Sequence, residues 1–403
     1  MLYKKYAFAV VILICFLTQE VNAKELSNEA FNDVQISLLT YSPGEKIYSI
    51  FGHSAIRIHN PLTGEDFVYN YGTFNFEQPG FYLKFLEGKL VYSLSRASFE
   101  RVKQSIIFEN RSMVETPLIL DSNEKIQIRA FLENNLLPEN RDYRYDFFYD
   151  NCATRIIHLL NSCITDTLML SPQVLPELKY RQLLDPYLRP RPWIHMGIDL
   201  LMGTSADKVA RFTEPAFLPD YLHLIIKNYK LKDNKVPVRL SRNDIVHVKN
   251  YQATRIKKLT PSIILWPLFI LSLISFMVDS YFRPLLCQIG NLILFITGLT
   301  SLLLSYLWIF SDHFIFRYNV DLLWLNPLLL IVAFVKYPKL QVKRTKLNQL
   351  ILLFTITLVA IGIIASLIIE RNLNLTALGM AMLVVITDKL RSIRRTINST
   401  SKS

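Results

Sequence analysis

A cysteine and a histidine carry the strongest chemical signal in this chain of 403 residues. Cys152 follows Asp150-Asn151 at the predicted start of a helix, and His53 lies in Phe51–Ala55, which is predicted to enter a strand. The N–H groups and the dipole of a helix N-terminus favour an anion, and thiols placed there have lowered pKa values. A nearby imidazole can take the thiol proton and return it later in a reaction. The pair therefore predicts a thiolate nucleophile with a histidine base.

The predicted helix after Asn151 presents Cys152 on its buried face. Ile156, Leu159 and Cys163 follow at spacings of four, three and four residues, which is the spacing of one helix face. Cys163 would lie about 16 Å from Cys152 along such a helix, whereas a disulfide needs Cα atoms within about 7 Å. Cys152 is therefore predicted to be a free thiol. The alternative is that Cys152 is only a small core residue.

His53 belongs to a predicted β-hairpin. Residues 49–58 and 67–74 alternate or are rich in aromatic and β-branched residues, and the turn signal Asn60–Gly64 lies between them. Further strands and helices are predicted from alternation and from the capping signal Asp121–Glu124. The predicted strands are 34–41, 89–94 and 143–147, and the predicted helices are 81–86, 121–136 and a short piece near Ile198 after a Pro-rich loop, 186–193.

The register of the hairpin decides which residues surround His53. If Ile58 pairs near Phe67, then His53 comes opposite Gly72, and Asn70 shares its face one step along the strand. A slip of one residue would remove that neighbour. In this register Asn70 is the predicted third catalytic residue beside Cys152 and His53.

Composition divides the chain into an exported part and a membrane part. Residues 1–23 have a basic start, an apolar run and a small-residue end, which predicts a cleavable signal peptide rather than the alternative, an uncleaved anchor. Residues 24–258 predict an exported α+β domain, 259–390 a transmembrane helical domain, and 391–403 a basic cytoplasmic tail. The apolar segments are 262–280, 285–310, 320–335, 349–369 and 374–388, of which the first, second and fourth are long enough to cross the roughly 30 Å hydrocarbon core.

The distribution of basic residues predicts the orientation in the membrane. With residues 24–258 outside, five crossings place both the loop from Lys336 to Lys346 and the tail from Lys389 to Arg395 inside, as the positive-inside rule requires. The predicted location is the inner membrane, multi-pass, with the exported domain in the periplasm. The net charge of +12 therefore reflects topology, and nucleic acid is not an expected partner.

Other polar residues are candidates for binding. Arg57 and Arg155 lie near the predicted centre and are read either as ion-pair residues or as clamps for a phosphate. Asn319 and Asn326, seven residues apart, would share a helix face at the outer end of the third apolar segment, where polar groups are costly. No two histidines show metal-ligand spacing on one element, so no metal and no cofactor are expected.

Four motifs of the exported part and one of the membrane part resemble the Bacteroidota lipoprotein N-acyltransferase family. The order of histidine before cysteine also resembles circularly permuted papain-like domains. The matching stretches are Phe51–Arg57, Tyr69–Phe74, Tyr145–Arg155, Phe217–Leu222 and Tyr318–Pro327.

The resemblance implies a fold and a reaction. The fold would be an exported permuted papain-like domain followed by a bundle of about five transmembrane helices. Cys152 would take a fatty acyl chain from a membrane phospholipid as a thioester, with His53 as its base, and pass it to the α-amine of the diacylglyceryl-cysteine of a lipoprotein. Tyr71 and Asn151, inside the matched motifs, would contact substrate together with Arg57, Arg155, Asn319 and Asn326.

Two other functions remain open at this point. A membrane-anchored cysteine amidase or peptidase acting on cell-wall peptide would use Cys152 and His53 equally well, but it gives the apolar segments no task beyond tethering. A non-enzymatic envelope sensor or assembly factor would need neither side chain for chemistry. Replacement of Cys152 separates the last reading from the first two.

Overall fold

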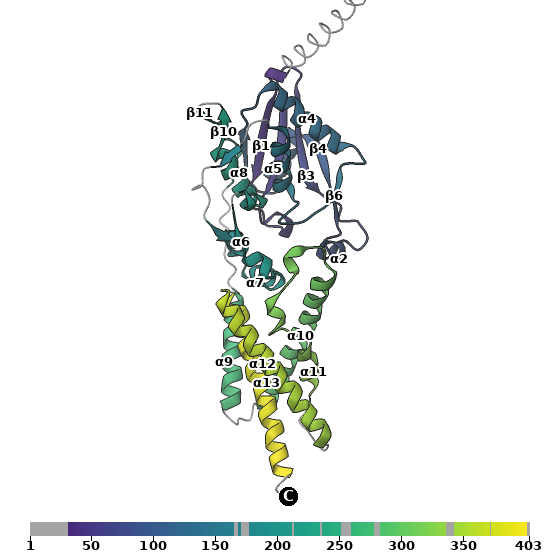
Figure 1. Ribbon diagram of the computed structural model, residues 1–403, viewed down its shortest axis with the longest axis vertical. Helices are drawn as coiled ribbons and strands as arrows, with labels where there is room; N and C mark the ends of the chain where they lie inside the picture. The colour runs from purple at the N-terminus through teal and green to yellow at the C-terminus, as the bar shows by residue number, and fades with distance from the viewer. Residues whose placement is uncertain are drawn as a thin grey trace, which may run out of the picture. The chain divides into compact units, whose positions relative to one another are not determined.

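The computed structural model of the protein describes residues 31–164, 168–170, 177–211, 213–233, 236–250, 259–277, 283–335, 342–370 and 372–400. By internal contacts the chain divides into two compact units (Figure 1). The predicted signal peptide lies outside the described residues. The sheet unit comprises Met1–Phe81, Leu90–Glu177 and Ala210–Ala253, and the helical unit comprises Tyr82–Lys89, Leu178–Val209 and Thr254–Ser403.

The sheet unit is built on a seven-stranded sheet whose neighbouring strands are antiparallel. Its strand order is β12-β5-β1-β2-β3-β4-β6. A three-stranded sheet of β11, β10 and β7 accompanies it. The strands of the large sheet are β1 Gln35–Tyr41, β2 His53–Asn60, β3 Glu65–Thr73, β4 Val91–Ser98, β5 Met113–Pro117, β6 Asp142–Arg144 and β12 Ile245–Val248, and those of the small one are β7 Leu168–Leu170, β10 Tyr229–Asp233 and β11 Val236–Arg239.

Helices cover both faces of the large sheet. Ile56 and Ile58 of β2 pack in one core cluster with α4 (Ser122–Leu136), α5 (Cys152–Cys163) and α8 (Pro219–Asn228). Ala55 packs on the opposite face in a second cluster with α3 (Phe99–Phe108). This division confirms the two-residue alternation predicted along β2. The short 3-10 helices of this unit are η1 Ile47–Ser49 and η3 Glu214–Phe217.

The predicted hairpin register is confirmed. Ile58 pairs with Phe67 across β2 and β3. The turn between them is fixed by Asn60, whose Oδ1 accepts the N–H groups of Leu62 at 3.0 Å and Thr63 at 3.3 Å. Asn and Gly are favoured in such turns because the asparagine side chain bonds nearby backbone. The register places the end of β3 beside the start of β2.

The predicted capping box is also confirmed. Asp121 accepts the N–H of Glu124 at 2.8 Å, and the Glu124 carboxylate accepts the N–H of Asp121 at 3.0 Å. This reciprocal pair satisfies two N–H groups that a helix start otherwise leaves free. Helix α4 accordingly begins at Ser122 and ends at Leu136, as predicted.

The helical unit contains the apolar helices (Figure 1). Its core includes Trp324, Leu329, Val359 and Met382, all nearly inaccessible to solvent. Gly362 lets α12 approach the backbone at Trp324 closely, since a Cβ built on it would lie 2.5 Å from the Trp324 backbone nitrogen. The elements of this part are α9 Pro261–Met277, α10 Arg283–Phe310, η4 Phe314–Phe316, η5 Val320–Leu322, α11 Leu328–Phe334, α12 Val342–Ile368 and α13 Leu373–Thr400.

The lengths of these helices confirm the second and fourth predicted spans and correct the prediction for the first, third and fifth segments. Three described helices are long and apolar enough to span a membrane, at 285–310, 346–368 and 373–395. The first apolar segment forms a helix of only 17 residues, and the fifth forms one of 28. The third begins with the three-residue η5 and a stretch of turns, and these are followed by the seven-residue α11. The number of five crossings stays a prediction.

Two stretches of the predicted exported domain pack in the helical unit. One is 82–89, which includes most of α2 (Phe81–Leu86), and the other is 178–209. The second stretch corrects the predicted Pro-rich loop. Pro186 lies inside a helix, and Pro192 occupies the first position of another, where a missing N–H costs nothing. The elements here are β8 Leu178–Lys179, α6 Tyr180–Leu188, α7 Pro192–Leu201, η2 Thr204–Asp207 and β9 Val209–Ala210.

Candidate active site

Helix α5 begins at Cys152 because Asn151 caps it. The Asn151 Oδ1 accepts the N–H groups of Ala153 at 2.8 Å and Thr154 at 2.9 Å, and the Thr154 hydroxyl accepts the Asn151 N–H at 2.7 Å. This capping box fixes the first turn of the helix. The thiol therefore lies where the helix dipole favours its ionised form.

His53 is the first residue of β2 and is held on two sides. Its Nε2 donates to Asn70 Oδ1 at 2.5 Å, and the Asn70 Nδ2 donates in turn to the Thr73 hydroxyl at 3.4 Å. The Tyr41 ring stacks on the imidazole, with ring centroids 5.7 Å apart and planes at 19°. Since Asn70 occupies Nε2, the other ring nitrogen, Nδ1, is the one that faces the thiol.

The His53 imidazole and the Cys152 side chain both lie beside Gly72. A Cβ built on Gly72 would lie 3.5 Å from His53 Cε1 and 3.8 Å from Cys152 Cβ. The glycine has a φ of 94°, a backbone conformation that other residues rarely adopt. The pairing of β3 with β4 shifts between Asn70 and Thr73, so an irregularity of the strand falls at this point. The two side chains predicted to react therefore meet beside a position without a side chain.

The thiol and the imidazole ionise each other. Burial alone raises the pKa of the Cys152 thiol, but the charge of His53, their mutual hydrogen bond and the backbone N–H groups of Ser54 and Ala153 bring the pKa below its ordinary value. Burial alone lowers the pKa of His53, but the Cys152 charge and the hydrogen bonds to Cys152 and Asn70 leave it raised. Both shifts favour a thiolate–imidazolium pair, the form in which a cysteine is nucleophilic.

Two neighbours of this pair do not follow from the sequence motifs. Tyr41 pairs with His53 across β1 and β2, and its buried hydroxyl has no hydrogen-bond partner in the described part of the chain. Arg111 is buried, lies with its guanidinium 5.9 Å from the Tyr41 ring and lowers the His53 pKa slightly by its charge. The alternating strand 34–41 could have indicated Tyr41, had its pairing partner been known.

The predicted binding residue Arg57 is engaged away from the thiol. It makes a bidentate pair with Asp66, at 2.7 Å for both bonds, and a third bond of 2.7 Å to Glu115. Its guanidinium lies 3.6 Å from the centroid of the Phe99 ring on the α3 face. Contact of Arg57 with a phosphate stays a prediction, and it would require one of these ion pairs to open.

Arg155, on the first turn of α5, and Tyr71, on β3, are both engaged within the protein beside the cysteine. Arg155 pairs with Asp150 at 2.6 and 2.8 Å and lies 3.6 Å from the centroid of the Tyr143 ring. Tyr71 is 2% exposed in the core beneath α5, and burial raises its pKa to about 12. The buried Tyr71 side chain therefore offers less surface to a substrate than the prediction assumed.

Asn151 uses its side chain fully within the protein. Besides the two bonds that its oxygen accepts, its Nδ2 donates to the carbonyls of Phe147 and Phe217, each at 2.7 Å. An amide side chain has no further hydrogen-bonding capacity than these four. The structure thus gives Asn151 the task of holding α5, and a direct substrate contact would have to replace one of these bonds.

Asn319 and Asn326 do not share a helix face, in contrast to the prediction. Asn319 caps η5 by accepting the N–H of Asp321 at 3.0 Å, and it donates to the Leu200 carbonyl at 2.7 Å. Asn326 donates to the Leu323 carbonyl at 2.8 Å, and its buried oxygen has no partner in the described residues. Both side chains stabilise the turns that replace the expected third helix.

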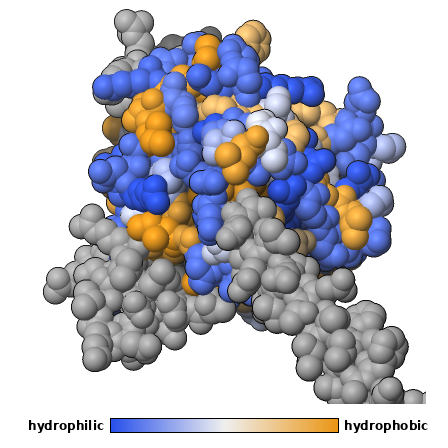
Figure 2. All heavy atoms as spheres, turned by 90° about the horizontal axis from the view of Figure 1, so that it is seen from above, coloured by the Kyte–Doolittle hydropathy of each residue, from blue (hydrophilic) through white to orange (hydrophobic). Residues whose placement is uncertain are grey.

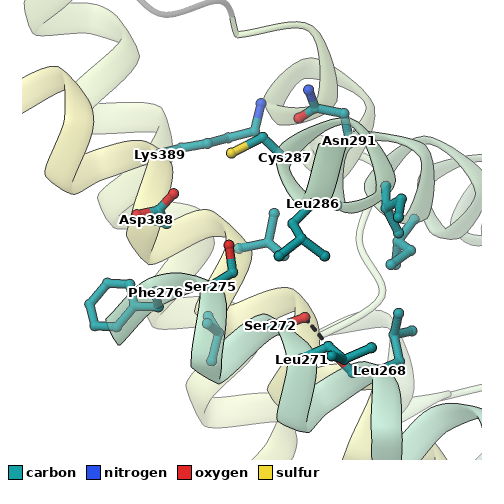
Figure 3. Close-up of a pocket in the computed structure, with 15 residues that line it drawn as sticks. Leu268, Leu271, Ser272, Ser275, Phe276, Leu286, Cys287, Asn291, Asp388 and Lys389 are labelled. Atoms are coloured by element: carbon teal, nitrogen blue, oxygen red, sulfur yellow. Dashed lines mark hydrogen bonds between the residues drawn. The ribbon is translucent and has the colours of Figure 1, made fainter. Parts of the chain in front are cut away.

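A cavity of about 60 Å³ lies among α9, α10 and α13 of the helical unit (Figure 3). Cys287, Asn291, Asp388 and Lys389 contribute polar atoms to its lining. None of the predicted catalytic residues and no histidine lines it, so it is not the site of the thiol chemistry. In the described residues no group of three or more His, Cys, Asp or Glu side chains is arranged to hold a metal ion.

Comparison with known proteins matches both parts of the chain. The family model of the Lnb N-terminal periplasmic domain matches residues 24–185, and that of the Lnb transmembrane domain matches residues 252–399. No curated protein and no solved structure matches the chain significantly. The two matches cover more than half of the sequence in the order expected from its motifs. The chain therefore belongs to the Lnb lipoprotein N-acyltransferase family, as a membrane protein with a periplasmic domain.

Proposed function

We propose that this protein is a cysteine-dependent lipoprotein N-acyltransferase of the inner membrane. The observation that carries the proposal is the Cys152–His53–Asn70 arrangement, in which the thiol pKa is lowered and the imidazole pKa is raised. Membership of the Lnb family supports the proposed substrate class. A membrane phospholipid is the proposed acyl donor, and a diacylated lipoprotein is the proposed acceptor.

The first half-reaction loads the enzyme. The Cys152 thiolate attacks the carbonyl carbon of a phospholipid ester, and the carbonyl electrons move onto oxygen. The proposed donor to that oxyanion is the Cys152 N–H at the start of α5, since Asn151 Oδ1 accepts the next two N–H groups. As the carbonyl re-forms, the C–O bond of the ester breaks and His53 gives its proton to the departing lysophospholipid alcohol. An acyl thioester on Cys152 results.

The second half-reaction transfers the acyl chain. The neutral α-amine of the lipoprotein cysteine attacks the thioester carbonyl, and His53 accepts a proton from the attacking nitrogen. Collapse of the intermediate breaks the C–S bond, forms the amide and restores the thiolate–imidazolium pair. An α-amine has a pKa near 8, so a base of modest strength suffices at neutral pH.

Water competes with the amine for the thioester. An amine wins only when it is positioned and water is scarce at the carbonyl. Both lipid substrates are confined to the membrane, and the enzyme carries helices that are long and apolar enough to span it. Tethering therefore raises the local concentration of donor and acceptor relative to a soluble enzyme.

Mass spectrometry of the intact full-length protein tests the proposal. After incubation in nanodiscs with phospholipid, Cys152 should carry one fatty acyl adduct, and a synthetic diacylglyceryl-cysteine peptide should remove it and become N-acylated. The Cys152→Ser variant should show neither product, whereas Cys163→Ser should show both. Absence of an adduct in the wild-type protein, with the chain folded, would overturn the proposal.

The same assay separates the cell-wall amidase reading. Cleavage of cell-wall peptide by the wild-type protein, without acylation of the lipopeptide, would support that function instead. Full N-acylation by Cys152→Ser would favour a non-enzymatic role for the thiol.

A further inference from the structure

The connection between β3 and β4 is fastened to the end of a membrane helix. Residues 82–89 belong to the helical unit, and they bond to the segment that follows α10. The Ser311 hydroxyl donates to the Leu86 carbonyl at 2.8 Å, the Asp312 N–H to the Glu87 carbonyl at 2.8 Å, and the His313 Nε2 to the Phe85 carbonyl at 2.9 Å.

Two further contacts strengthen this attachment. The Tyr306 hydroxyl near the end of α10 bonds to the Glu87 carboxylate. Gly88 has a φ of 71°, and a Cβ there would lie 3.1 Å from the His313 nitrogen, so the backbones approach as closely as a glycine allows. Residues 85–87 are therefore held to the end of α10 and to the segment after it by both side-chain and backbone hydrogen bonds.

One side of α2 is apolar and exposed in the described structure. Tyr82 is 78% exposed, Leu83 52% and Phe85 43%. Lys84 between them is also exposed. The face of the molecule shown in Figure 2, by contrast, is mainly hydrophilic with small separate hydrophobic patches. Three neighbouring exposed apolar side chains on one helical turn are unusual for a surface in water.

The end of α10 shows the residues of a membrane interface. This helix is a candidate span at 285–310, and its last turn exposes Trp308, Ile309 and Phe310. The following segment exposes Tyr318 by 61%. Tryptophan and tyrosine collect where hydrocarbon meets headgroups, so the end of α10 marks that level, and α2 is bonded to it.

We infer that α2 is an interfacial element whose Tyr82, Leu83 and Phe85 side chains insert into the lipid leaflet around the end of α10. Its occupant is the bilayer itself, because α2 and the residue after it bond to the end of α10, a candidate span with an exposed apolar last turn, and to the segment that follows it. Lys84 extends to the headgroups, where a basic side chain meets anionic lipid. The inference concerns membrane contact and does not depend on the proposed reaction.

The inference gives the β3–β4 connection a task. Gly72 lies only ten residues before Tyr82 in the sequence, and ten residues reach at most about 35 Å when fully extended. Strand β3 carries Asn70 and Gly72 and leads into this connection, so the segment that follows the strand beside the thiol is the one assigned to lipid contact.

Photo-crosslinking tests the contact directly. The full-length protein, with p-benzoylphenylalanine in place of Leu83, is placed in nanodiscs of phosphatidylethanolamine and phosphatidylglycerol and irradiated. Intact mass should reveal a covalent phospholipid adduct. The matched control carries the same residue in place of Leu62, which is 70% exposed in the β2–β3 turn at the other end of β3, and it should give no adduct.

A second position keeps the test independent of one substitution. The photoreactive residue in place of Tyr82 should also capture phospholipid, and alkylation of Cys152 should stay as in the wild type, which verifies folding. No adduct at either position, or equal adducts at 83 and 62, would overturn the inference. Because the readout is a lipid adduct, it is unaffected if the enzyme proves not to be an acyltransferase.

Discussion

Helix α5 carries a buried cysteine at each end, and the pKa values of the two thiols are shifted in opposite directions. Cys152 is 8% exposed and Cys163 4%. Burial raises the pKa of the Cys163 thiol, whereas the His53 charge and hydrogen bonds reverse that effect for Cys152. Both lie in the same core cluster. Burial therefore does not decide the reactivity of these thiols, and the partner and the helix end do.

Removal of either sulfur should break the comparison most visibly. Cys152→Ala should lower N-acylation by at least about 10⁴-fold, the scale seen when a nucleophile is removed. Cys163→Ala should keep activity within about twofold and cost about 1 kcal/mol of folding free energy through a small cavity. Initial rates with a lipopeptide acceptor and denaturant unfolding measure the two effects. Equal loss in both variants would mean that the thiols act only as packing.

Removal of the imidazole should make Cys152 resemble Cys163. His53→Ala should reduce turnover by about 10²–10⁴-fold, as expected for loss of a general acid and base. The wild-type rate should be bell-shaped in pH, falling below the lowered thiol pKa and above the raised imidazole pKa, because only the thiolate–imidazolium form is competent. The variant should lose the alkaline limb. An unchanged profile would show that another residue is the base.

A side chain at position 72 should disturb the pair without removing either member. Gly72→Ala places a Cβ in van der Waals contact with both His53 and Cys152, and the φ of 94° strains alanine, so relief of that strain moves backbone that touches the pair. A displacement of about 1 Å at a reacting group costs roughly 10² in rate. We expect such a loss in kcat with a folded protein, measured by steady-state kinetics. Gly64→Ala, with an equally positive φ but open space around it, is the control and should remain active.

Alkylation at different pH values should sharpen the comparison within one molecule. At neutral pH, iodoacetamide should modify Cys152 at least about tenfold faster than Cys163, since only the thiolate reacts. Modification of Cys152 should slow as the pH falls through its lowered pKa, and that of Cys163 should become appreciable only above the ordinary thiol range. Peptide mapping by mass spectrometry gives both rates. Parallel pH profiles would contradict the assigned shifts.

The smallest effect is expected for the third residue. Asn70→Ala removes one hydrogen bond that orients the imidazole, worth about 0.5–1.5 kcal/mol, so the rate should fall by up to about tenfold. The His53 pKa should also fall, because its bond to Asn70 contributes to raising it. The alkaline limb of the pH profile should then move to lower pH. A loss as large as that of His53→Ala would assign Asn70 a more direct part.

The site could be predicted to the extent that it depended on local patterns. Alternation fixed the faces of β2, the Asn60–Gly64 turn fixed its register with β3, and that register placed Gly72 and Asn70 beside His53. Tyr41 required the pairing of β1 with β2, which are joined by a longer connection without a comparable turn signal. Arg57 was assigned to binding on its charge alone, but in the structure it pairs with Asp66 and Glu115, which are distant from it in sequence.

The membrane part was harder to predict because the length of each apolar run was the only sequence signal for its helices. Helix α13 continues to Thr400, well past the apolar run. Asp388 and Lys389 are compatible with a helix, and the Lys389 amine donates to the Ala333 and Val335 carbonyls at the end of α11. Such a bond is favourable at a helix C-terminus. In the third apolar segment, the turns around Asn319 take the place of part of the expected helix, so α11 is short.

The interleaving of the two units has a consequence for release from the cell envelope. The chain changes unit at 81/82, 89/90, 177/178, 209/210 and 253/254. A protease that cut only the last of these junctions would separate residues 1–253 covalently from the helices that follow, but the stretches 82–89 and 178–209 of that fragment belong to the helical unit by their packing. Release of a soluble fragment by that one cleavage therefore also requires these two stretches to leave the helical unit.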